Sequence, residues 1–280
     1  MAQPRVISIS QVNAYLGCPL KYRFQYVDKV PRPWRVAGMA FGTSIHAAVE
    51  WFQKEWLAGR SPDLPDVLRV FDADWYAQNV EPLVFSERES REGLAEKGRA
   101  MLQLYLESQS GTKPVAVEQP FELDLADPET GEVLEVRLRG IIDLIEDGDV
   151  LVDLKTAGRT LESGGLERHL QLSAYALAYL LFKGSVPRLR LDMLLKTTKP
   201  RLERHETTRS LEDLSWTARL IREVSLAIET EHFFPNPSWR CTECEYFAHC
   251  QQWRGTWPVQ SEDELIAIGN GEGVGEIAGA

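Results

Sequence analysis

The stretch GIIDLIEDGDVLVDLKT, residues 140–156, has the pattern of two β-strands joined by a tight turn. Asp147-Gly148 is a favoured hairpin turn, and apolar residues alternate on both sides of it. Residues two apart in a strand share a face, so Asp153 and Lys155 point the same way, and the turn sets Asp143 nearly opposite Asp153. The hairpin therefore predicts two carboxylates and one ammonium group on a small patch.

This patch has the groups that a phosphodiesterase needs. Two close carboxylates repel each other unless a cation shares them, and oxygen ligands suit Mg²⁺ or Mn²⁺. Water on such an ion can attack phosphorus while Lys155 orients it or stabilises the developing charge. Of the nine lysines, only Lys155 has an acid two positions before it. From these residues alone, the alternative is a surface salt bridge on a half-exposed sheet.

Further strands and helices surround the hairpin. Strand patterns are expected at 115–125, 132–146, 149–155, 188–197 and 201–208. Helices are expected from Ser10 to Cys18, from Thr43 or Ser44, and at 64–78, 87–108, 165–183 and 210–232. This order predicts an α/β fold with a mixed central sheet flanked by helices.

The four cysteines form one constellation. Cys241, Cys244 and Cys250 lie close together near one end of the chain, and Cys18 lies near the other. Without a signal-peptide pattern the thiols are expected to stay reduced, and clustered thiols then bind metal more often than they form disulfides. Four thiolates can hold a 4Fe–4S cluster or, alternatively, tetrahedral zinc. Common zinc modules pair two Cys-x2-Cys knuckles, but this chain has only one.

Three motifs, in order, resemble those of the PD-(D/E)XK nuclease superfamily. They are Gly140-Ile141-Ile142-Asp143, Val152-Asp153-Leu154-Lys155-Thr156 and Gln171-Leu172-Ser173-Ala174-Tyr175. The chain is most similar to the RecB-like exonucleases, which include the AddB nuclease domain and the four-cysteine CRISPR-adaptation exonucleases. The resemblance covers roughly residues 8–255 and implies a restriction-endonuclease-like core.

The resemblance also implies roles for the motif residues. Asp143 and Asp153 would bind the catalytic metal with the Leu154 carbonyl, and Lys155 would activate water. Many relatives have Glu at the position of Asp153, and both acids occur in the superfamily.

Three side chains outside the hairpin gain roles from the same resemblance. His46, otherwise expected as a solvated residue in a first helical turn, matches a metal-binding histidine of the family. Gln171 and Tyr175 share one helix face and would contact DNA and support the site, although a core aromatic is the alternative for Tyr175. Glu118 and Glu122 on the first long strand are further acids near the site without an assigned role.

The cysteine pattern is also similar to that of the branch, since Cys18-Pro19 is followed by Tyr22 and Arg23. It implies a 4Fe–4S cluster that joins the N- and C-terminal segments, with zinc as the alternative cofactor.

The 280 residues are 44% hydrophobic, and no Pro/Gly/Ser-rich linker divides them. We expect one RecB-like nuclease domain over 1–257, with a helical insertion at about 60–110 and the iron–sulfur region at 18 and 241–250. An acidic, glycine-rich tail at 258–280 is expected to be disordered. No apolar run is long enough for a membrane span, so a cytoplasmic protein without membrane contact is predicted.

The net charge of −11 is unusual for a protein that binds DNA. Acidic residues in the tail and in a metal site account for part of it. Basic residues concentrate at 188–204, either as a ribbon that faces the substrate or as a solvated strand pair.

The sequence thus favours a metal-dependent DNA exonuclease of recombination and repair, phage DNA processing or CRISPR adaptation. DNA is the expected partner. A helicase or another recombination or CRISPR protein would supply unwinding, because the chain has no Gly-x4-Gly-Lys-Ser/Thr loop. One alternative is a catalytically inactive DNA-end-binding or assembly subunit with the same fold. Another is a zinc-stabilised structural module.

Overall fold

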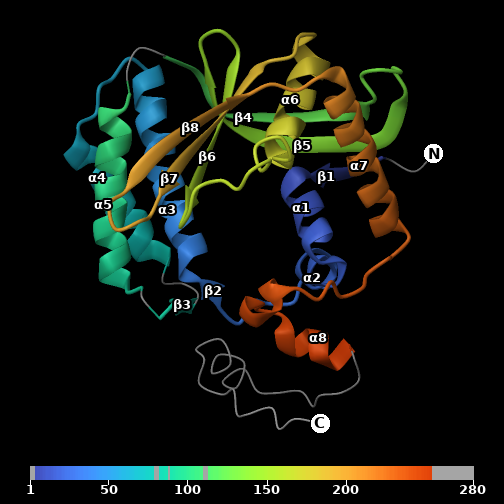
Figure 1. Ribbon diagram of the computed structural model, residues 1–280, viewed down its shortest axis with the longest axis horizontal. Helices are drawn as coiled ribbons and strands as arrows, with labels where there is room; N and C mark the ends of the chain where they lie inside the picture. The colour runs from blue at the N-terminus through green and yellow to red at the C-terminus, as the bar shows by residue number, and fades with distance from the viewer. Residues whose placement is uncertain (1–3, 79–81, 88, 110–112, 254–280) are drawn as a thin grey trace.

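The computed structural model describes residues 4–78, 82–87, 89–109 and 113–253. Its centre is a mixed β-sheet with helices on both faces, which confirms the predicted fold class (Figure 1). Six strands in the described part of the chain form this sheet: β1 (Arg5–Ser8), β4 (Pro114–Ala126), β5 (Val133–Glu146), β6 (Val150–Ala157), β7 (Arg188–Leu195) and β8 (Arg201–Thr207).

Most neighbouring strands are antiparallel. β4–β5, β5–β6 and β7–β8 run antiparallel, whereas β1–β5 and β6–β7 run parallel. The predicted turn joins β5 to β6, and there Gly148 and Asp149 have φ of 76° and 57°. Glycine adopts this left-handed conformation without steric cost, which explains its place in the turn.

The strand β5 has neighbours along both of its edges. β4 follows one edge from Glu146 to Val133. β1 and β6 must therefore share the opposite edge, where β1 pairs with 136–139 and β6 with 144–146. No strand of the described residues pairs with 140–143 on this edge, and we call this interval between β1 and β6 the β5 gap.

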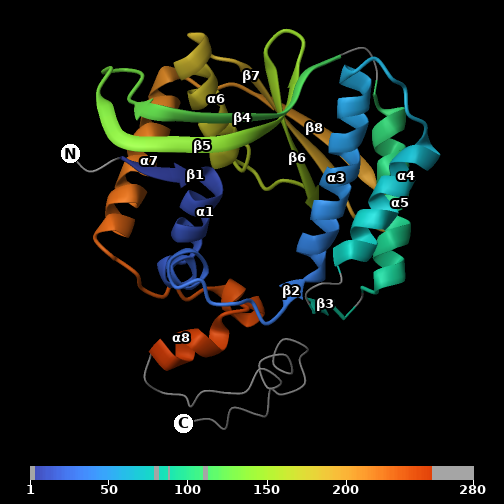
Figure 2. The same ribbon diagram turned by 180° about the vertical axis from the view of Figure 1, so that it is seen from behind.

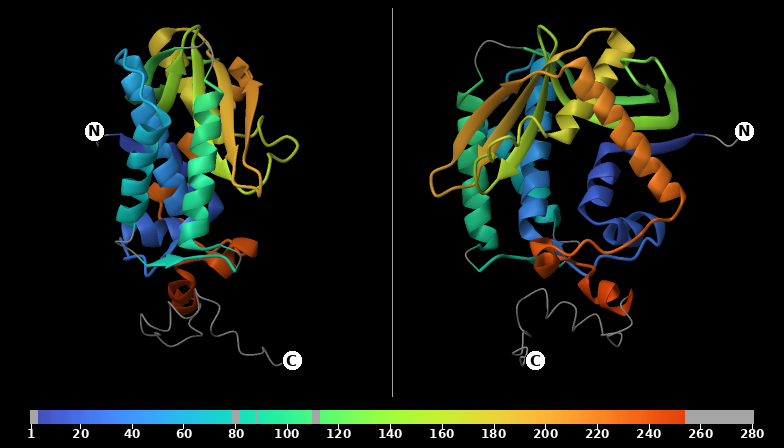
Figure 3. Two further views of the ribbon diagram at one scale, coloured as in Figure 1. Left: turned by 90° about the vertical axis from the view of Figure 1, so that its left-hand side faces the viewer. Right: turned by 45° about the vertical axis from the view of Figure 1, so that its right-hand side comes forward.

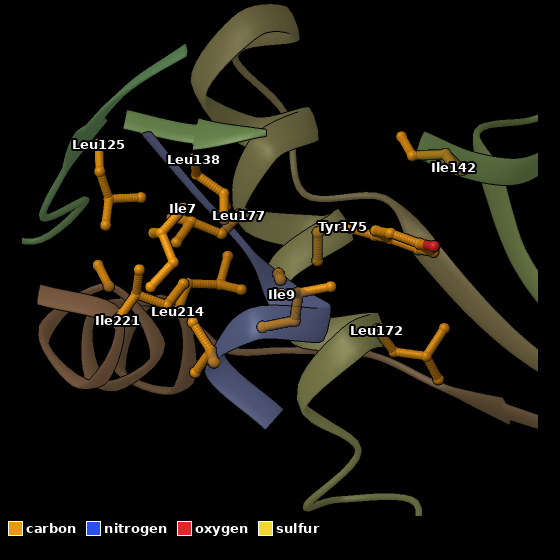
Figure 4. Close-up of a cluster of buried hydrophobic side chains, with 14 of the residues drawn as sticks. Ile7, Ile9, Leu125, Leu138, Ile142, Leu172, Tyr175, Leu177, Leu214 and Ile221 are labelled. Carbon is orange, nitrogen blue, oxygen red and sulfur yellow. The ribbon is translucent and has the colours of Figure 1, made fainter. Parts of the chain in front are cut away.

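The helices α1 (Ile9–Gly17), α6 (Leu170–Lys183) and α7 (Leu211–Glu229) cover one face of the sheet. Their apolar side chains pack against the sheet in one buried cluster, which includes Ile7, Leu138, Leu177 and Ile221 (Figure 4). The first helix stays in place because the side chain of Ser8 caps it and accepts a hydrogen bond from the Gln11 N–H.

The helices α3 (Ala37–Leu57), α4 (Leu64–Ala77) and α5 (Arg91–Glu107) cover the other face (Figures 2 and 3). Phe41, Phe71 and Leu102 pack there against Leu154 of β6 and Leu194 of β7. The short strands β2 (Arg35–Val36) and β3 (Leu83–Val84) pair beside these helices.

The N- and C-terminal segments lie side by side below the sheet (Figure 1). They comprise α2 (Pro19–Tyr22), the π-helical turn η1 (Arg23–Val27), the 3-10 helix η3 (Trp239–Glu243) and α8 (Phe247–Trp253). Tyr15 donates to the His232 carbonyl at 2.6 Å, and Lys21 pairs with Glu245 at 2.7 Å. These contacts join the two segments without help from the cysteines.

Several predicted helix boundaries were wrong. The first helix begins at Ile9 after the Ser8 cap, not after Ser10. The helix expected from Thr43 or Ser44 begins at Ala37, and the fifth begins at Arg91 instead of 87 because Ser90 caps it. The helix expected from 165 begins at Leu170 because His169 caps it, accepting from the Leu172 N–H at 3.4 Å.

The described helices include none that is both long and apolar enough to cross a membrane. The predicted tail, 258–280, lies outside the described residues. The assignment of residues 1–257 to one domain stays a prediction.

Candidate active site

The site lies where β5 and β6 separate. Their ladder ends at the pair Leu144–Val152, and the next residues on the two strands are Asp143 and Asp153. The carboxylate of Asp143 reaches across the separation, where its Oδ2 accepts the Leu154 backbone N–H at 3.0 Å. The register of β5 and β6 therefore places Asp143 and Asp153 next to each other at the end of the ladder, as predicted.

The carboxylate of Asp153 is fully buried, with 0% of its side chain exposed. Lys155 Nζ donates to Asp153 Oδ1 and lies 3.0 Å from both carboxylate oxygens. The second oxygen, Oδ2, is buried and accepts no hydrogen bond from the described residues. Burial raises the pKa of Asp153, against the opposing effect of the Lys155 charge. The pair of Asp153 and Lys155 is therefore not the surface salt bridge that the sequence left as the alternative, because its carboxylate is buried.

Hydrogen bonds connect the two carboxylates through the helix α6. Lys155 Nζ also donates to Gln171 Oε1 at 2.9 Å, and Gln171 Nε2 donates to the Tyr175 hydroxyl at 2.6 Å. Tyr175 in turn donates to Asp143 Oδ1 at 3.3 Å. We call this path from Asp153 to Asp143 the Lys-Gln-Tyr relay.

Tyr175 is both a core residue and a site residue. It lies on α6, is 2% exposed and belongs to the buried cluster shown in Figure 4. Its hydroxyl nevertheless reaches Asp143. Burial, together with the charges of Asp143 and Asp153, raises the pKa of Tyr175. Its hydroxyl therefore remains a protonated donor at physiological pH. The core position expected as the alternative is confirmed, whereas the role of Tyr175 in DNA contact stays a prediction.

His46 lies in the middle of α3, not in its first turn, because the helix begins nine residues earlier than His46. Its Nδ1 is 3.9 Å from Asp143 Oδ2, and the ring lies beside Leu154 in the same small cavity. Burial lowers the pKa of His46, although the Asp143 charge opposes this. A neutral imidazole is the form that binds metal.

The donors fit a small divalent ion by their chemistry. His46, Asp143 and Leu154 line a cavity of about 20 Å³, enough for one water or one ion. The carboxylates of Asp153 and Asp143 are the oxygen ligands that Mg²⁺ and Mn²⁺ prefer. Within the described ranges, no three His, Cys, Asp or Glu side chains are already arranged to hold an ion. Binding of an ion would therefore require the side chains of the site to move closer together.

Three further acids, Glu50, Glu118 and Asp192, line the same small cavity. Glu118 on β4 has a left-handed backbone, with φ of 51°. Burial and the charges of Glu50 and Asp143 raise the pKa of Glu118 to about 7. Glu50 follows His46 by one helical turn, and this spacing of four residues was the signal that could have identified it. Glu122, in contrast, pairs with Arg137 at 2.7 Å.

The four cysteines surround a second cavity of about 300 Å³ between α1–α2 and the C-terminal segment. All four lie within the described residues, and none is in a disulfide. Backbone N–H groups point at two sulfurs, from Asn236 to Cys18 and from Ser238 to Cys241, each at 3.4 Å. Burial raises the pKa of Cys244 to about 11, so its thiolate needs a cation nearby. The fold brings the predicted constellation to one place.

Part of the basic stretch at 188–204 is engaged in contacts within the protein. Arg190 is 11% exposed and pairs with Glu146 at 2.6 Å and Asp192 at 2.7 Å. Arg204 donates to the Ser108 carbonyl at 3.2 Å, and Lys196 pairs with Glu89 at 2.6 Å. The Arg201 side chain is 62% exposed, so a ribbon that faces the substrate stays a prediction.

Comparison with known proteins adds to this geometry. A protein of Mycobacterium phage L5, the Gene 69 protein, is 34% identical over 74 residues, which are 26% of this chain. The match spans only 24% of that relative's length. A crystal structure from Eubacterium rectale named "Putative exonuclease" superposes with a TM-score of 0.58. It covers 94% of this chain and 93% of its own at 13% identity, a level that shows a shared fold alone.

A family profile covers far more of the sequence than the phage relative does. The profile of the PD-(D/E)XK nuclease superfamily matches residues 6–251, which include all of the central sheet except Arg5 and all four cysteines. The chain therefore belongs to the PD-(D/E)XK nuclease superfamily.

Proposed function

We propose that the protein is a Mg²⁺- or Mn²⁺-dependent deoxyribonuclease of the RecB-like branch that degrades DNA from its ends. The Lys-Gln-Tyr relay is the observation that carries this proposal. It joins two buried or half-buried carboxylates through hydrogen bonds, and it is built from polar residues of all three motifs: Asp143, Asp153, Lys155, Gln171 and Tyr175.

Four groups would hold the ion: the carboxylates of Asp143 and Asp153, the His46 imidazole and the Leu154 carbonyl. A bound divalent ion supplies a Lewis acid for the phosphate and a water of lowered pKa. Gln171 holds the Lys155 ammonium at the edge of the site, where it can orient a water or stabilise charge on phosphate oxygens. Tyr175 fixes the Asp143 carboxylate through its Oδ1, while Leu154 fixes Oδ2.

The exonuclease activity is a finer proposal than the nuclease family itself. It is supported by the motif resemblance and by the name of the Eubacterium rectale protein, which has the same fold. DNA recombination and repair, phage DNA processing and CRISPR adaptation are the processes that use such enzymes, with a helicase or another such protein as partner. We assign the activity to one nuclease domain over residues 1–257, with α4 and α5 as its helical insertion.

For the cysteine site we propose a 4Fe–4S cluster. The four sulfurs of a zinc site lie about 3.8 Å apart, given Zn–S bonds of about 2.3 Å. No such compact set exists among the residues that the structure describes, whereas the cysteines surround an open cavity of about 300 Å³. A cubane cluster separates its thiolates more widely than one ion does, so it suits this cavity better.

The test is degradation of end-labelled single- and double-stranded DNA with Mn²⁺ by the full chain. Asp153→Ala and Lys155→Ala should each abolish degradation while the protein keeps its far-UV circular dichroism. Glu206→Ala, an exposed residue on β8, is the matched control and should keep full activity. Full activity in both site variants would remove the site. Binding of DNA ends by the wild type without any cleavage would instead support the inactive end-binding subunit.

A further inference from the structure

The β5 gap opens into a cavity on one side of the candidate active site. The cavity measures about 610 Å³ and is lined by Asp143, Gln171 and Tyr175 of the site. Its other walls come from Ser8–Ser10 at the start of α1, from Pro120–Glu122 of β4 and from Arg139–Ile141 of β5. It is therefore continuous with the site and lies in the interval that neither β1 nor β6 fills.

Asp143 lines two cavities of very different size, and the one in the β5 gap is large enough for a substrate group. The cavity on the His46 side measures about 20 Å³, which admits an ion or a water but no organic group. Pockets that bind small organic ligands have volumes of about 300–1,000 Å³. The cavity in the β5 gap therefore has room for a nucleoside attached to the scissile phosphate, whereas the cavity beside His46 does not.

An aromatic ring is built into this cavity. Phe121 lies opposite Gly140 in the β4–β5 ladder, and its ring meets Tyr175 edge-on with centroids 6.4 Å apart. A Cβ atom at position 140 would lie 2.6 Å from the Phe121 ring, so only glycine lets the ring rest on the strand. Phe121 is partly exposed, unlike the buried aromatic residues of the core.

We propose that this cavity binds one unpaired nucleoside adjoining the scissile phosphate, with its base packed against Phe121. The inference rests on the proposed nuclease function and names the form in which the site takes its substrate. A base inside a duplex is stacked between its neighbours, so it would have to leave that stack before it could pack against Phe121. A single strand, or a duplex end that has opened, delivers such a base.

The pocket can be tested by moving one abasic residue along a single-stranded oligonucleotide. With the wild-type full chain and Mn²⁺, kcat/KM should fall about tenfold at the position next to the cleaved bond and stay unchanged elsewhere, because stacking on an aromatic ring contributes that much per base. Phe121→Ala should lose about tenfold on intact DNA. It should also show no further loss at the abasic position, since the base and the ring act as one pair.

Phe121→Leu is the second variant, for use if Phe121→Ala folds poorly. It keeps an apolar side chain on Gly140 but has no aromatic face. It should therefore show the same loss on intact DNA and no further loss at the abasic position. Val133→Ala, an exposed residue on the same hairpin that does not line the cavity, is the control and should retain the abasic penalty. A penalty that is absent in the wild type, or that persists in both Phe121 variants, overturns the proposal.

A binding measurement separates this failure from failure of the proposed function. Lys155→Ala is mixed with a single strand that carries 2-aminopurine next to the expected cleavage position. Fluorescence should be quenched as the base stacks, and Phe121→Leu in the same background should abolish the quenching. This result supports the pocket even if the wild type cleaves no DNA, and unquenched fluorescence in Lys155→Ala counts against the pocket.

Discussion

The carboxylate of Asp143 takes the place of a strand partner for Leu154. Where the β5–β6 ladder stops, the Leu154 N–H donates to Asp143 Oδ2 at 3.0 Å instead of to a backbone carbonyl. This hydrogen bond fixes the Asp143 carboxylate to the sheet through Oδ2, and the direction of its other oxygen, Oδ1, is then fixed as well. That oxygen receives the Tyr175 hydroxyl at 3.3 Å. The sheet and α6 thus orient one carboxylate from two sides.

Tyr175→Phe should reduce the rate of DNA cleavage about tenfold, because Asp143 loses its second fixed hydrogen bond and Gln171 loses its acceptor. Tyr179→Phe is a matched control on the same helix, since Tyr179 donates to Asp149 at 2.6 Å, outside the site. Each variant should lose about 1 kcal/mol of unfolding free energy. Equal activity of the two variants, measured with one labelled DNA, would contradict a role for the Tyr175 hydroxyl in cleavage.

Asp153→Asn should abolish cleavage and yet raise the melting temperature of the metal-free protein. Burial of the Asp153 charge costs stability that Lys155 does not fully restore, as the raised pKa of Asp153 shows. The amide removes that charge and keeps an oxygen for Lys155 Nζ. We expect an increase of about 2–4 °C for each kcal/mol gained. Calorimetry in EDTA measures it, and a lower melting temperature than wild type would contradict the assigned burial cost.

Magnesium should stabilise the protein more at about pH 8.5 than at about pH 5.5. The folded metal-free protein keeps a proton on Asp153 at pH values where the unfolded chain has lost it, because burial raises the pKa of Asp153. Its stability therefore falls as pH rises through the folded pKa, and a bound cation cancels that loss. Melting curves with and without Mg²⁺ measure the difference. An equal increase in melting temperature at both pH values would contradict the assignment of Asp153 as a ligand of the ion.

Cys18→Ser should release iron and sulfide from anaerobically purified protein and lower its melting temperature. A link between Cys18 and the C-terminal cysteines closes most of the chain into a loop, worth about 5 kcal/mol in the unfolded state. Lys21→Ala is the control, since Lys21 lines the same cavity and pairs with Glu245 without a sulfur ligand. It should retain the metal. One zinc per chain in the wild type would contradict the 4Fe–4S cluster and support the zinc site.

The hairpin was predictable because its signals are local. Asp147-Gly148 marks the turn, and the alternation on either side places Asp153 and Lys155. The wrong start of α3 has a physical reason, because Gly38 and Gly42 weaken the helical pattern before Thr43. A Cβ at position 42 would lie 2.9 Å from the Thr156 hydroxyl, so close packing on β6 favours glycine there. Tertiary contact, which sequence patterns do not show, determines that helix start.

The β5 gap could not be predicted for a similar reason. Residues 5–8 carry no strand signal strong enough to be noticed, and their partner is β5 at 136–139, far along the chain. The Lys-Gln-Tyr relay was only partly foreseen. The spacing of Gln171 and Tyr175 placed them on one helix face, but their contacts with Lys155 and Asp143 depend on how α6 crosses the sheet.

The late position of β1's partner has a consequence for how the enzyme matures. β4 to β8 follow one another in the chain and can assemble from near neighbours, whereas β1 must wait for a strand made much later. An intermediate with the hairpin and both acids in place would still lack the α1 wall. A folding chain would then have both carboxylates in place before the α1 wall of the β5-gap cavity is formed.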